Sequence, residues 1–223
     1  MRLIYFDTET TGLDPSTDSI IELALIIIED KKVIEEYDEF IKIDTVLDED
    51  IEELTGITNQ MLQEEGLSEE RVATDLMHRL QKNTIMIAHN AQFDLNFIYQ
   101  LLCKYYPVQT VKVVLRRMKW LDTLTILKDR KGYPHKLKDM VEYYNLGDFQ
   151  FHRAIDDTRV LPLAVGKMYG ERGDILEYLN IFGYNQKYGI TGEQFDFITY
   201  IPQDYHNNIV GKDKILPKKK IKK

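Results

Sequence analysis

The order of the apolar segments is the feature that most constrains what this chain can fold into. Three strand-like runs come first, at residues 2–7, 20–29 and 32–43, and the "EDKK" between the last two is typical of a hairpin turn. Helical patterns then alternate with single short strands at residues 84–88 and 113–121. Three strands followed by this alternation predict an α/β fold, in which helices pack on a mixed five-stranded sheet.

The helices are predicted from the spacing of apolar residues. In "SEERVATDLMHRLQKN", Val72, Leu76 and Leu80 recur at every fourth position, and Ser68 is a suitable N-cap. Further helices are predicted at residues 136–144 and 155–168, with short helical pieces on both sides of Gly56. The helix in "FDLNFIYQLLCKYY" ends before Pro107, and its apolar face is predicted to contain Phe97, Ile98, Leu101, Leu102 and Tyr105.

The composition is that of a soluble globular protein. The chain has 223 residues, of which 43% are apolar and 30% are charged, so it can bury a substantial core. Its longest apolar run, "LALIII", is far too short to span a membrane, and the N-terminus lacks the apolar core of a secretion signal. The single cysteine, Cys103, excludes a disulfide within the chain. We therefore expect a cytoplasmic protein that does not associate with membranes.

The last fifty or so residues differ in character from the rest. The stretch "FGYNQKYGITGEQFDFITYIPQDY" is rich in aromatic residues and glycine. We interpret residues 176–211 as a small C-terminal appendage, a β-hairpin that packs on a domain formed by residues 1–175. A docking element for a polymerase or another partner is the alternative interpretation.

The charge is distributed unevenly along the chain. Residues 212–223 contain seven lysines and one aspartate, although the net charge of the whole chain is −8. We expect these residues to form a basic flexible tail, and loose attraction to nucleic acid is one interpretation of it. The rest of the chain is strongly acidic, which argues against a general phosphate-binding surface.

The first predicted strand ends in two acids. In "IYFDTETTGL", Asp7 and Glu9 are two positions apart, and both project to one face because strand side chains alternate. Like charges this close raise the cost of ionising each other. The pair therefore requires a positive partner, and ligands commonly bind at the carboxyl ends of strands in open α/β sheets.

Two other segments carry acids where a helix begins. Asp94, in "IAHNAQFDLNF", opens a helix after a strand, and alone it is explained by its favourable interaction with the helix dipole. His152 and Asp157, in "FHRAIDDTRVL", are five residues apart, and a lone histidine there is more often structural. Together, four carboxylates in one cleft would form a site for Mg²⁺ or Mn²⁺, two of which can clamp a phosphodiester. His152 could then act as general base on the attacking water.

The same three segments resemble the motifs of an enzyme family. In this order, "FDTETTG", "HNAQFD" and "HRAIDD" are similar to the three motifs of the DEDDh 3′→5′ exonucleases, which include the proofreading epsilon subunit of bacterial DNA polymerase III. The resemblance covers about residues 1–170 and also includes "TGITNQML", "WLDTL" and "HKLKDMVEYYNL". It implies a ribonuclease H-like fold, with helices on both faces of the mixed sheet.

The resemblance also implies a role for each matching residue. His152 would be the general base, and its five-residue spacing to Asp157 selects Asp157 over the neighbouring Asp156. The ligands of two divalent cations, Mg²⁺ or Mn²⁺, would be Asp7, Glu9, Asp94 and Asp157. The residues that contact the 3′-terminal nucleotide, with Leu13 as a wedge against a base, would be Thr10, Thr11, Gly12, Leu13, Asn90 and Phe93.

One position departs from the family pattern. Many members have a histidine immediately before "GIT", where this chain has Thr55. Because that histidine contacts substrate in some members, the departure concerns nucleotide binding at this edge and not the chemistry.

The leading hypothesis is a metal-dependent exonuclease that releases nucleoside 5′-monophosphates from a free 3′ end. Single-stranded DNA is the expected substrate, proofreading or repair the expected role, and a DNA polymerase subunit a candidate partner. An exoribonuclease acting on RNA would use the same five residues. A non-catalytic scaffold would usually lack an acid or the base, and none is missing. A glycoside hydrolase is disfavoured, because carboxylates at i and i+2 lie too close to flank a sugar ring.

Overall fold

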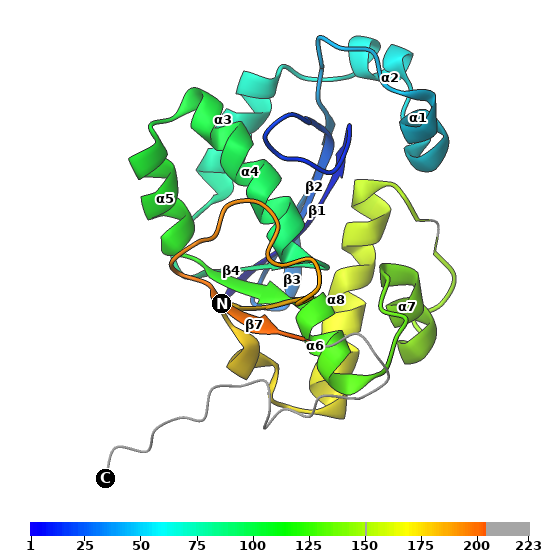
Figure 1. Cartoon of the computed structure of the whole chain (residues 1–223), viewed down its shortest axis with the longest axis vertical. Helices are drawn as coiled ribbons and strands as arrows, with labels where there is room; N and C mark the ends of the chain where they lie inside the picture. Colours follow the sequence, from blue (N-terminus) through cyan, green and yellow to red (C-terminus); the bar gives the residue numbers. More distant parts are fainter. Residues whose placement is uncertain (150, 204–223) are drawn as a thin grey trace.

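The computed structural model describes residues 1–149 and 151–203. Its centre is a five-stranded sheet with the strand order β3-β2-β1-β4-β5 (Figure 1). Pairs β1–β2 and β2–β3 are antiparallel, whereas pairs β1–β4 and β4–β5 are parallel. The predicted mixed five-stranded sheet is confirmed. The strands are β1 (Arg2–Thr10), β2 (Ile20–Glu29), β3 (Lys32–Phe40), β4 (Thr84–Ala88) and β5 (Lys119–Asp122).

Helices cover both faces of this sheet, as predicted. They are α1 (Glu49–Thr55), α2 (Asn59–Glu64), α3 (Glu69–Arg79), α4 (Ala91–Tyr105), α5 (Val108–Arg116), α6 (Thr123–Arg130), α7 (Leu137–Tyr144) and α8 (Ala154–Glu171), followed by the 3₁₀ helix η1 (Ile175–Tyr178). In Figure 1, α3, α4 and α5 lie to one side of the strands and α6, α7 and α8 to the other. Among the described residues, no helix is both long and apolar enough to cross a membrane.

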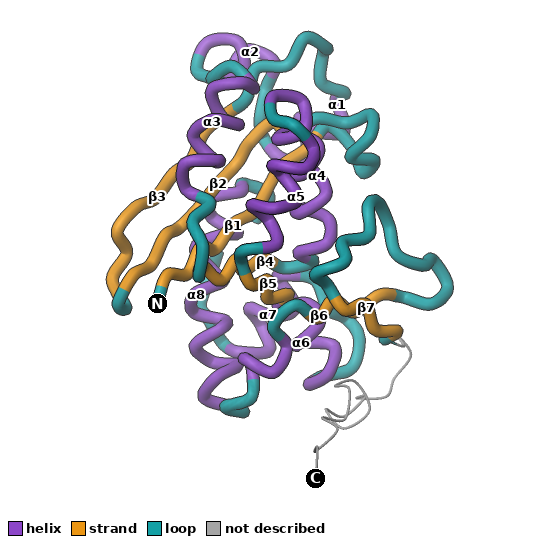
Figure 2. Tube along the Cα trace, turned by 90° about the vertical axis from the view of Figure 1, so that its left-hand side faces the viewer, coloured by secondary structure: helices purple, strands orange, loops and turns teal. Residues whose placement is uncertain are grey.

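The alternation of side chains along β1 divides the core in two. Ile4 and Phe6 pack with α3, α4 and α5 in one buried cluster, whereas Tyr5 packs with α6, α7 and α8 in another. Figure 2 shows the strands running between these groups of helices. The face that each β1 side chain occupies therefore decides which helix it meets.

Local signals in the sequence account for several boundaries. Asp30 and Lys31 adopt positive φ angles of 48° and 67° between β2 and β3, the backbone expected of a tight hairpin turn. The predicted N-cap is confirmed, since the Ser68 side chain accepts a hydrogen bond from the Arg71 amide at the start of α3.

Several sequence predictions in this part of the chain are wrong. The strand predicted at residues 113–121 is helix α5 up to Arg116, and only Lys119–Asp122 form a strand. Val111 and Leu115, four positions apart, are buried on one helical face, so packing favours a helix there. Tyr105 is 39% exposed and not part of the apolar face of α4. The first strand continues beyond residue 7 to Thr10.

The C-terminal segment adds two short strands, β6 (Ile181–Tyr184) and β7 (Thr199–Pro202). They pair in parallel, so the predicted hairpin is wrong: a connection of about 14 residues carries the chain back before β7 begins. Phe182, Phe195 and Ile198 are buried in the same cluster as α4 and α5. The predicted basic tail at residues 212–223 lies outside the described residues, and the domain boundary at residue 175 stays a prediction.

Candidate active site

The two acids of the first motif lie within β1 on the face that α8 covers. Asp7 and Glu9 follow Tyr5 at alternate positions, and Tyr5 packs against α8. Opposite them on β2, the register pairs Asp7 with the small Ala24 and Glu9 with Glu22. Both acids are therefore held on rigid backbone at the edge of the core.

Helix α8 brings a third carboxylate to this pair. Asp157 lies in the first turn of α8. Its carboxylate approaches those of Asp7 and Glu9, so that three oxygens, one from each residue, lie within 4.8 Å of one another. All three side chains are partly buried. Three carboxylates at this spacing are a suitable donor set for a hard divalent cation.

The fourth predicted acid reaches β1 from the opposite face. Asp94, in the first turn of α4, is 2% exposed. Its Oδ1 accepts hydrogen bonds from the Thr8 amide at 3.1 Å and from the Thr8 hydroxyl at 2.8 Å. Thr8 lies between Asp7 and Glu9, so Asp94 is fixed beside the cluster although it is not one of its three closest members.

The electrostatics show how crowded these acids are. Burial, together with the charges of Asp94, Asp157 and Glu9, holds the pKa of Asp7 well above its usual range. Burial and the neighbouring carboxylates also raise the pKa of Glu9 to about 8. Burial raises the pKa of Asp94 to about 7, although the hydrogen bonds from Thr8 oppose it, and that of Asp157 to about 7 as well. Ionising these crowded carboxylates is therefore costly, and a bound cation would offset that cost because it favours their ionised forms.

One oxygen of the cluster has no partner within the part of the chain that the structure describes. Asp157 Oδ1 is buried and accepts no hydrogen bond. Buried polar atoms are nearly always paired with protein, water or an ion. The orphaned oxygen and the donor set both fit a metal at Asp7, Glu9 and Asp157.

A buried ion pair that sequence reasoning missed fixes the start of α8. Glu22 is fully buried on β2 and accepts from Arg153 Nε at 3.0 Å and Nη2 at 2.7 Å. Its other oxygen accepts from the Ala154 amide at 2.8 Å. Glu22 thereby caps α8 and sets the position from which Asp157 reaches Asp7. A glutamate inside the apolar run "IIELALIII" was the available signal.

The structure does not bring the His152 side chain into the cluster. His152 is exposed, precedes α8 by two residues and has a φ of 71°. Its imidazole is not among the groups within 4.8 Å of the three carboxylates, whereas its backbone amide donates to the Asp157 carboxylate. The neighbouring Asp156 pairs with Arg159 at 3.2 Å instead of joining the cluster.

The turn after the first motif is tightly built except at its tip. The Thr10 hydroxyl donates to the Gly12 carbonyl at 2.6 Å, and the Thr11 hydroxyl accepts from the Ser19 amide at 2.9 Å. A Cβ on Gly12 would overlap the Asp18 carboxylate, which would have to move to admit it. Leu13, in contrast, is 85% exposed.

The second-motif residues Asn90 and Phe93 lie at the start of α4. Asn90 is exposed with a φ of 73°, and its amide donates to Asp122 Oδ1 at 2.9 Å. Asp122, also missed from the sequence, is buried and caps α6 as well. A small cavity is lined by Leu13, Pro15, Phe93, Asn96, Thr191 and Gly192.

The position that departs from the family pattern has a structural role in this chain. Thr55 is 4% exposed, and its hydroxyl donates to the Ile51 carbonyl at 2.8 Å and accepts from the Ile57 amide at 3.1 Å. Its hydrogen-bonding groups are thus used inside the protein, where they end α1.

The sequence of this chain is similar to parts of bacterial DNA polymerase III proteins. The chain is 37% identical over 158 residues to the PolC-type DNA polymerase III of Thermotoga petrophila, covering 70% of this chain and 11% of that protein. It is 31% identical over 157 residues to the DNA polymerase III subunit epsilon of Treponema pallidum, covering 70% of each. The chain thus spans only about a tenth of the length of the PolC-type polymerases it matches.

Solved structures share the fold. The crystal structure of E. coli exonuclease I in complex with a dA16 oligonucleotide superposes with a TM-score of 0.70 at 18% identity, covering 79% of this chain and 42% of that chain. Residues 4–162, which contain all three motifs, match the family model described as Exonuclease, RNase T. The chain therefore belongs to the RNase T family of exonucleases.

Proposed function

We propose that this chain is a metal-dependent 3′→5′ exonuclease that removes nucleoside 5′-monophosphates from single-stranded DNA. The observation that carries the proposal is the cluster of Asp7, Glu9 and Asp157, whose oxygens lie within 4.8 Å of one another. Their pKa values are raised, and one buried oxygen is unpartnered. Such a site is costly to build unless a cation binds there.

The residues that would hold two divalent cations, Mg²⁺ or Mn²⁺, are Asp7, Glu9, Asp157 and Asp94. When bound, such ions supply positive charge at the phosphate and lower the pKa of water. Asp94 would have a second task, because its hydrogen bonds to Thr8 fix the strand between Asp7 and Glu9. Glu22 and Arg153 would position Asp157 by holding the first turn of α8.

His152 would act as the general base. The water oxygen would attack the phosphorus that links the last two nucleotides, and His152 would take the proton of the water. The 3′ oxygen of the preceding nucleotide would leave and gain a proton from solvent, giving a free 3′-hydroxyl. The imidazole is exposed in the segment directly before α8, and exposed side chains change rotamer readily. Catalytic hydrogen bonds often form only in the substrate complex.

The terminal nucleotide would bind against the turn after the first motif. Thr10, Thr11 and Gly12 shape this turn, and the exposed Leu13 would contact a base. Asn90 and Phe93, at the start of α4, would line the other side.

The relatives suggest where such an activity would serve. Two are named as DNA polymerase III proteins, one as the epsilon subunit and one as PolC-type, and the solved structure was determined with a DNA oligonucleotide. We propose that the chain works in DNA proofreading or repair in the cytoplasm, with a polymerase subunit as a partner. The alternative substrate is RNA, which an enzyme distinguishes through contacts to the 2′-hydroxyl.

A time course on two 5′-labelled oligonucleotides, one DNA and one RNA of the same sequence, tests the proposal. Each is incubated with Mn²⁺, with Mg²⁺, with EDTA, and with the Asp157→Ala variant. We expect a ladder that shortens from the 3′ end, requires metal and is absent in the variant, with DNA the faster substrate. Folded protein that shortens neither strand with any metal would contradict the activity, and faster RNA shortening would reassign the substrate.

A further inference from the structure

The segment that follows β6 is anchored at both ends beside the active site. This segment, Asn185–Glu193, is called the C-terminal loop below. Just before it, the Gly183 amide donates to Thr125 Oγ1 at 2.7 Å, in the first turn of α6. At its other end, Gln92 Nε2, in the first turn of α4, donates to the carbonyls of Thr191 and Glu193, both at 2.9 Å. The loop therefore runs from the start of α6 to the start of α4, the helix that carries Asp94 (Figure 1).

The contact with α4 is close and specific. The Glu193 amide donates to Asn96 Oδ1 at 2.6 Å, and Tyr200 donates to Gln92 Oε1 at 2.9 Å. Gly192 has a φ of 72°, and a Cβ there would overlap the Asn96 side chain. Only glycine allows this approach, so the loop is built to lie against the first turn of α4.

The same loop borders the turn that follows the first motif. Thr191 and Gly192 line one small cavity together with Leu13 and Phe93. The loop thus forms the rim of the site on the side where the 3′-terminal nucleotide would bind. The family model ends at residue 162, so this rim lies beyond the part of the chain that the model matches.

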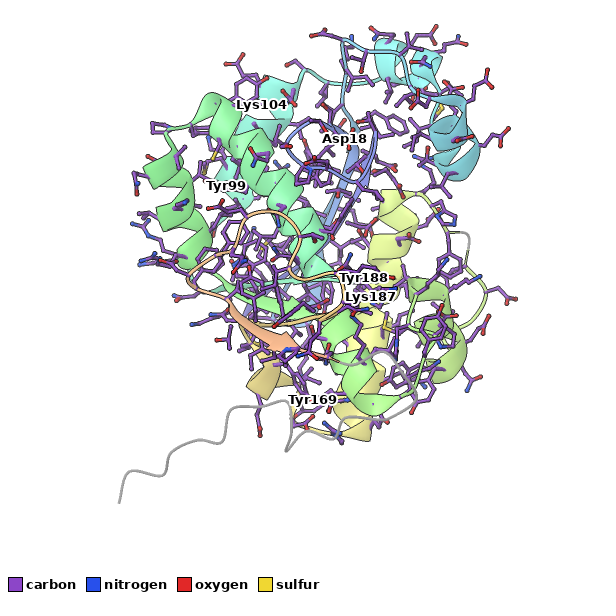
Figure 3. All side chains as sticks on the ribbon, viewed as in Figure 1. Asp18, Tyr99, Lys104, Tyr169, Lys187 and Tyr188 are labelled. Atoms are coloured by element: carbon purple, nitrogen blue, oxygen red, sulfur yellow. The ribbon has the colours of Figure 1, made fainter. Side chains whose placement is uncertain are left out.

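The tip of the loop carries an exposed lysine and an exposed tyrosine. The amides of Tyr188 and Gly189 donate to the Asn185 carbonyl at 3.1 and 2.8 Å, and the Lys187 amide donates to Asn185 Oδ1 at 2.8 Å. This turn leaves Tyr188 70% exposed, with Lys187 Nζ 5.0 Å from the centroid of its ring. Figure 3 shows the two side chains next to each other.

Lys187 is an exposed cation on a chain whose described part is strongly acidic. Within residues 1–149 and 151–203 it forms no ion pair. An unneutralised cation beside an exposed aromatic ring is the combination with which proteins hold single strands, through phosphate contacts and base stacking.

We propose that Lys187 and Tyr188 hold the DNA strand upstream of its 3′ end, with a base stacked on Tyr188 and a phosphate at Lys187. The proposal rests on the proposed exonuclease function, since it assumes that the 3′ end lies at the carboxylate cluster. It assigns the C-terminal segment to substrate binding, in addition to its packing on the core.

The test compares a substrate that has an upstream strand with one that has none. The first is a DNA oligonucleotide of about ten nucleotides, and the second is the p-nitrophenyl ester of thymidine 5′-monophosphate. Tyr188→Ala should raise KM for the oligonucleotide about fivefold or more, the lower end of what one stacked base contributes. Tyr188→Phe should restore it, and hydrolysis of the ester should not change in either variant. Lys187→Ala should weaken oligonucleotide binding and reduce its salt dependence by about one phosphate contact.

Matched controls are available on α8. Tyr169 is 58% exposed and Lys167 is also exposed, and Figure 3 shows Tyr169 away from the loop, at the C-terminal end of α8. Tyr169→Ala and Lys167→Ala should leave KM for the oligonucleotide and hydrolysis of the ester unchanged.

The outcomes separate the two proposals. An unchanged oligonucleotide KM in Tyr188→Ala, with normal hydrolysis by the wild-type chain, would overturn the assignment of the loop and leave the exonuclease function standing. A loss confined to RNA would overturn the assignment to DNA. If the wild-type chain binds the oligonucleotide but hydrolyses neither substrate, the proposed function fails, and the dissociation constants of the same variants still decide the role of the loop.

Discussion

The first turns of α4 and α8 each bring an aspartate to β1, and the two carboxylates meet different surroundings. Asp94 arrives on one face of the strand, where the amide and hydroxyl of Thr8 both donate to one of its oxygens. Asp157 arrives on the other face, close to Asp7 and Glu9, and one of its buried oxygens has no partner within the described residues.

The difference separates a carboxylate that the protein positions from one that it leaves available. Oδ1 of Asp94 is held by Thr8 and stabilises the strand between the two acids of the first motif, so only the other oxygen would contact a cation. Asp157 is held in place indirectly, because Glu22 and Arg153 fix the helix that carries it. The unpaired oxygen is then free to bind a ligand, which is why we place the cation at this side of β1.

Replacement of the two aspartates with alanine should give the largest effects, and it tests the comparison directly. Both variants should lose more than about 100-fold in activity, since even an outer partner of a metal ligand contributes roughly 10- to 100-fold. Their stabilities should differ. Asp94→Ala leaves the buried Thr8 groups unpaired and should lower the free energy of unfolding by about 1–3 kcal/mol. Asp157→Ala removes crowded negative charge, so it should leave the stability unchanged or slightly higher. Urea unfolding in EDTA measures both, and equal losses of stability would contradict the comparison.

Substitution of the proposed general base should give the next largest loss of activity. His152→Ala should lower the turnover number by roughly 10²–10⁴-fold, the usual range for a lost general base. Its backbone amide would still donate to Asp157, so the affinity for Mn²⁺ should be retained. Single-turnover kinetics together with an Mn²⁺ titration separate the two effects. A normal rate would remove His152 from the chemistry.

The support of α8 can be broken without replacing a carboxylate of the cluster. Arg153→Ala leaves Glu22 buried without its cation, and such losses cost roughly 3–5 kcal/mol when both partners are buried. Because the Arg153 side chain is 34% exposed, we expect a loss of stability at or below the lower end of this range. The control is Arg159→Ala, whose pairs with Glu36 and Asp156 are exposed and should contribute no more than about 1 kcal/mol. Equal destabilisation in the two variants would show that Glu22 does not depend on Arg153.

The support of Asp94 should be weaker and more local. Thr8→Val keeps the shape of the side chain and removes the hydroxyl that donates at 2.8 Å, which should cost about 1 kcal/mol. It should also raise the pKa of Asp94 further, because the bonds from Thr8 lower it. Thermal unfolding is the measurement, with the exposed Thr17→Val as control. No difference between the variants would mean that the backbone amide alone holds Asp94.

The pH dependence of stability without metal tests the raised pKa values of the cluster as a group. The cluster carboxylates have higher pKa values in the folded chain than in the unfolded one, so the folded state binds more protons and stability falls as pH rises. For Glu9 the fall should extend from its unfolded value of about 4.3 to about 8. Unfolding in EDTA across this range should show it, and excess Mg²⁺ should reverse the trend. Stability that rises with pH in EDTA would contradict the raised pKa values.

Local pattern was sufficient to predict some of the site and not the rest. The alternation of strand residues placed Asp7 and Glu9 on one face, which needs no knowledge of distant residues. The bond between Thr8 and Asp94 joins positions 86 apart, and that between Glu22 and Arg153 joins positions 131 apart, so neither is visible in a local pattern. Glu22 nevertheless left a signal, because a charge inside an apolar strand requires a buried partner.

Other differences come from packing and torsion. A strand is predicted at residues 113–121, but burial of Val111 and Leu115 on one face stabilises the helix α5. The spacing between His152 and Asp157 predicts both side chains in the cleft. The positive φ of His152 instead presents its amide to Asp157 and leaves its ring exposed, a choice that sequence spacing does not determine.

An Mn²⁺ titration of the wild-type chain and of Asp157→Ala at pH 7, in two buffers of different ionisation enthalpy, tests the central claim most directly. Glu9, with a pKa of about 8, is mostly protonated at this pH without metal, so binding must release protons. We expect saturable binding with proton release in the wild-type chain, and affinity at least about tenfold weaker in the variant. Equal binding by both proteins, or binding without proton release, would contradict a cation site at Asp7, Glu9 and Asp157.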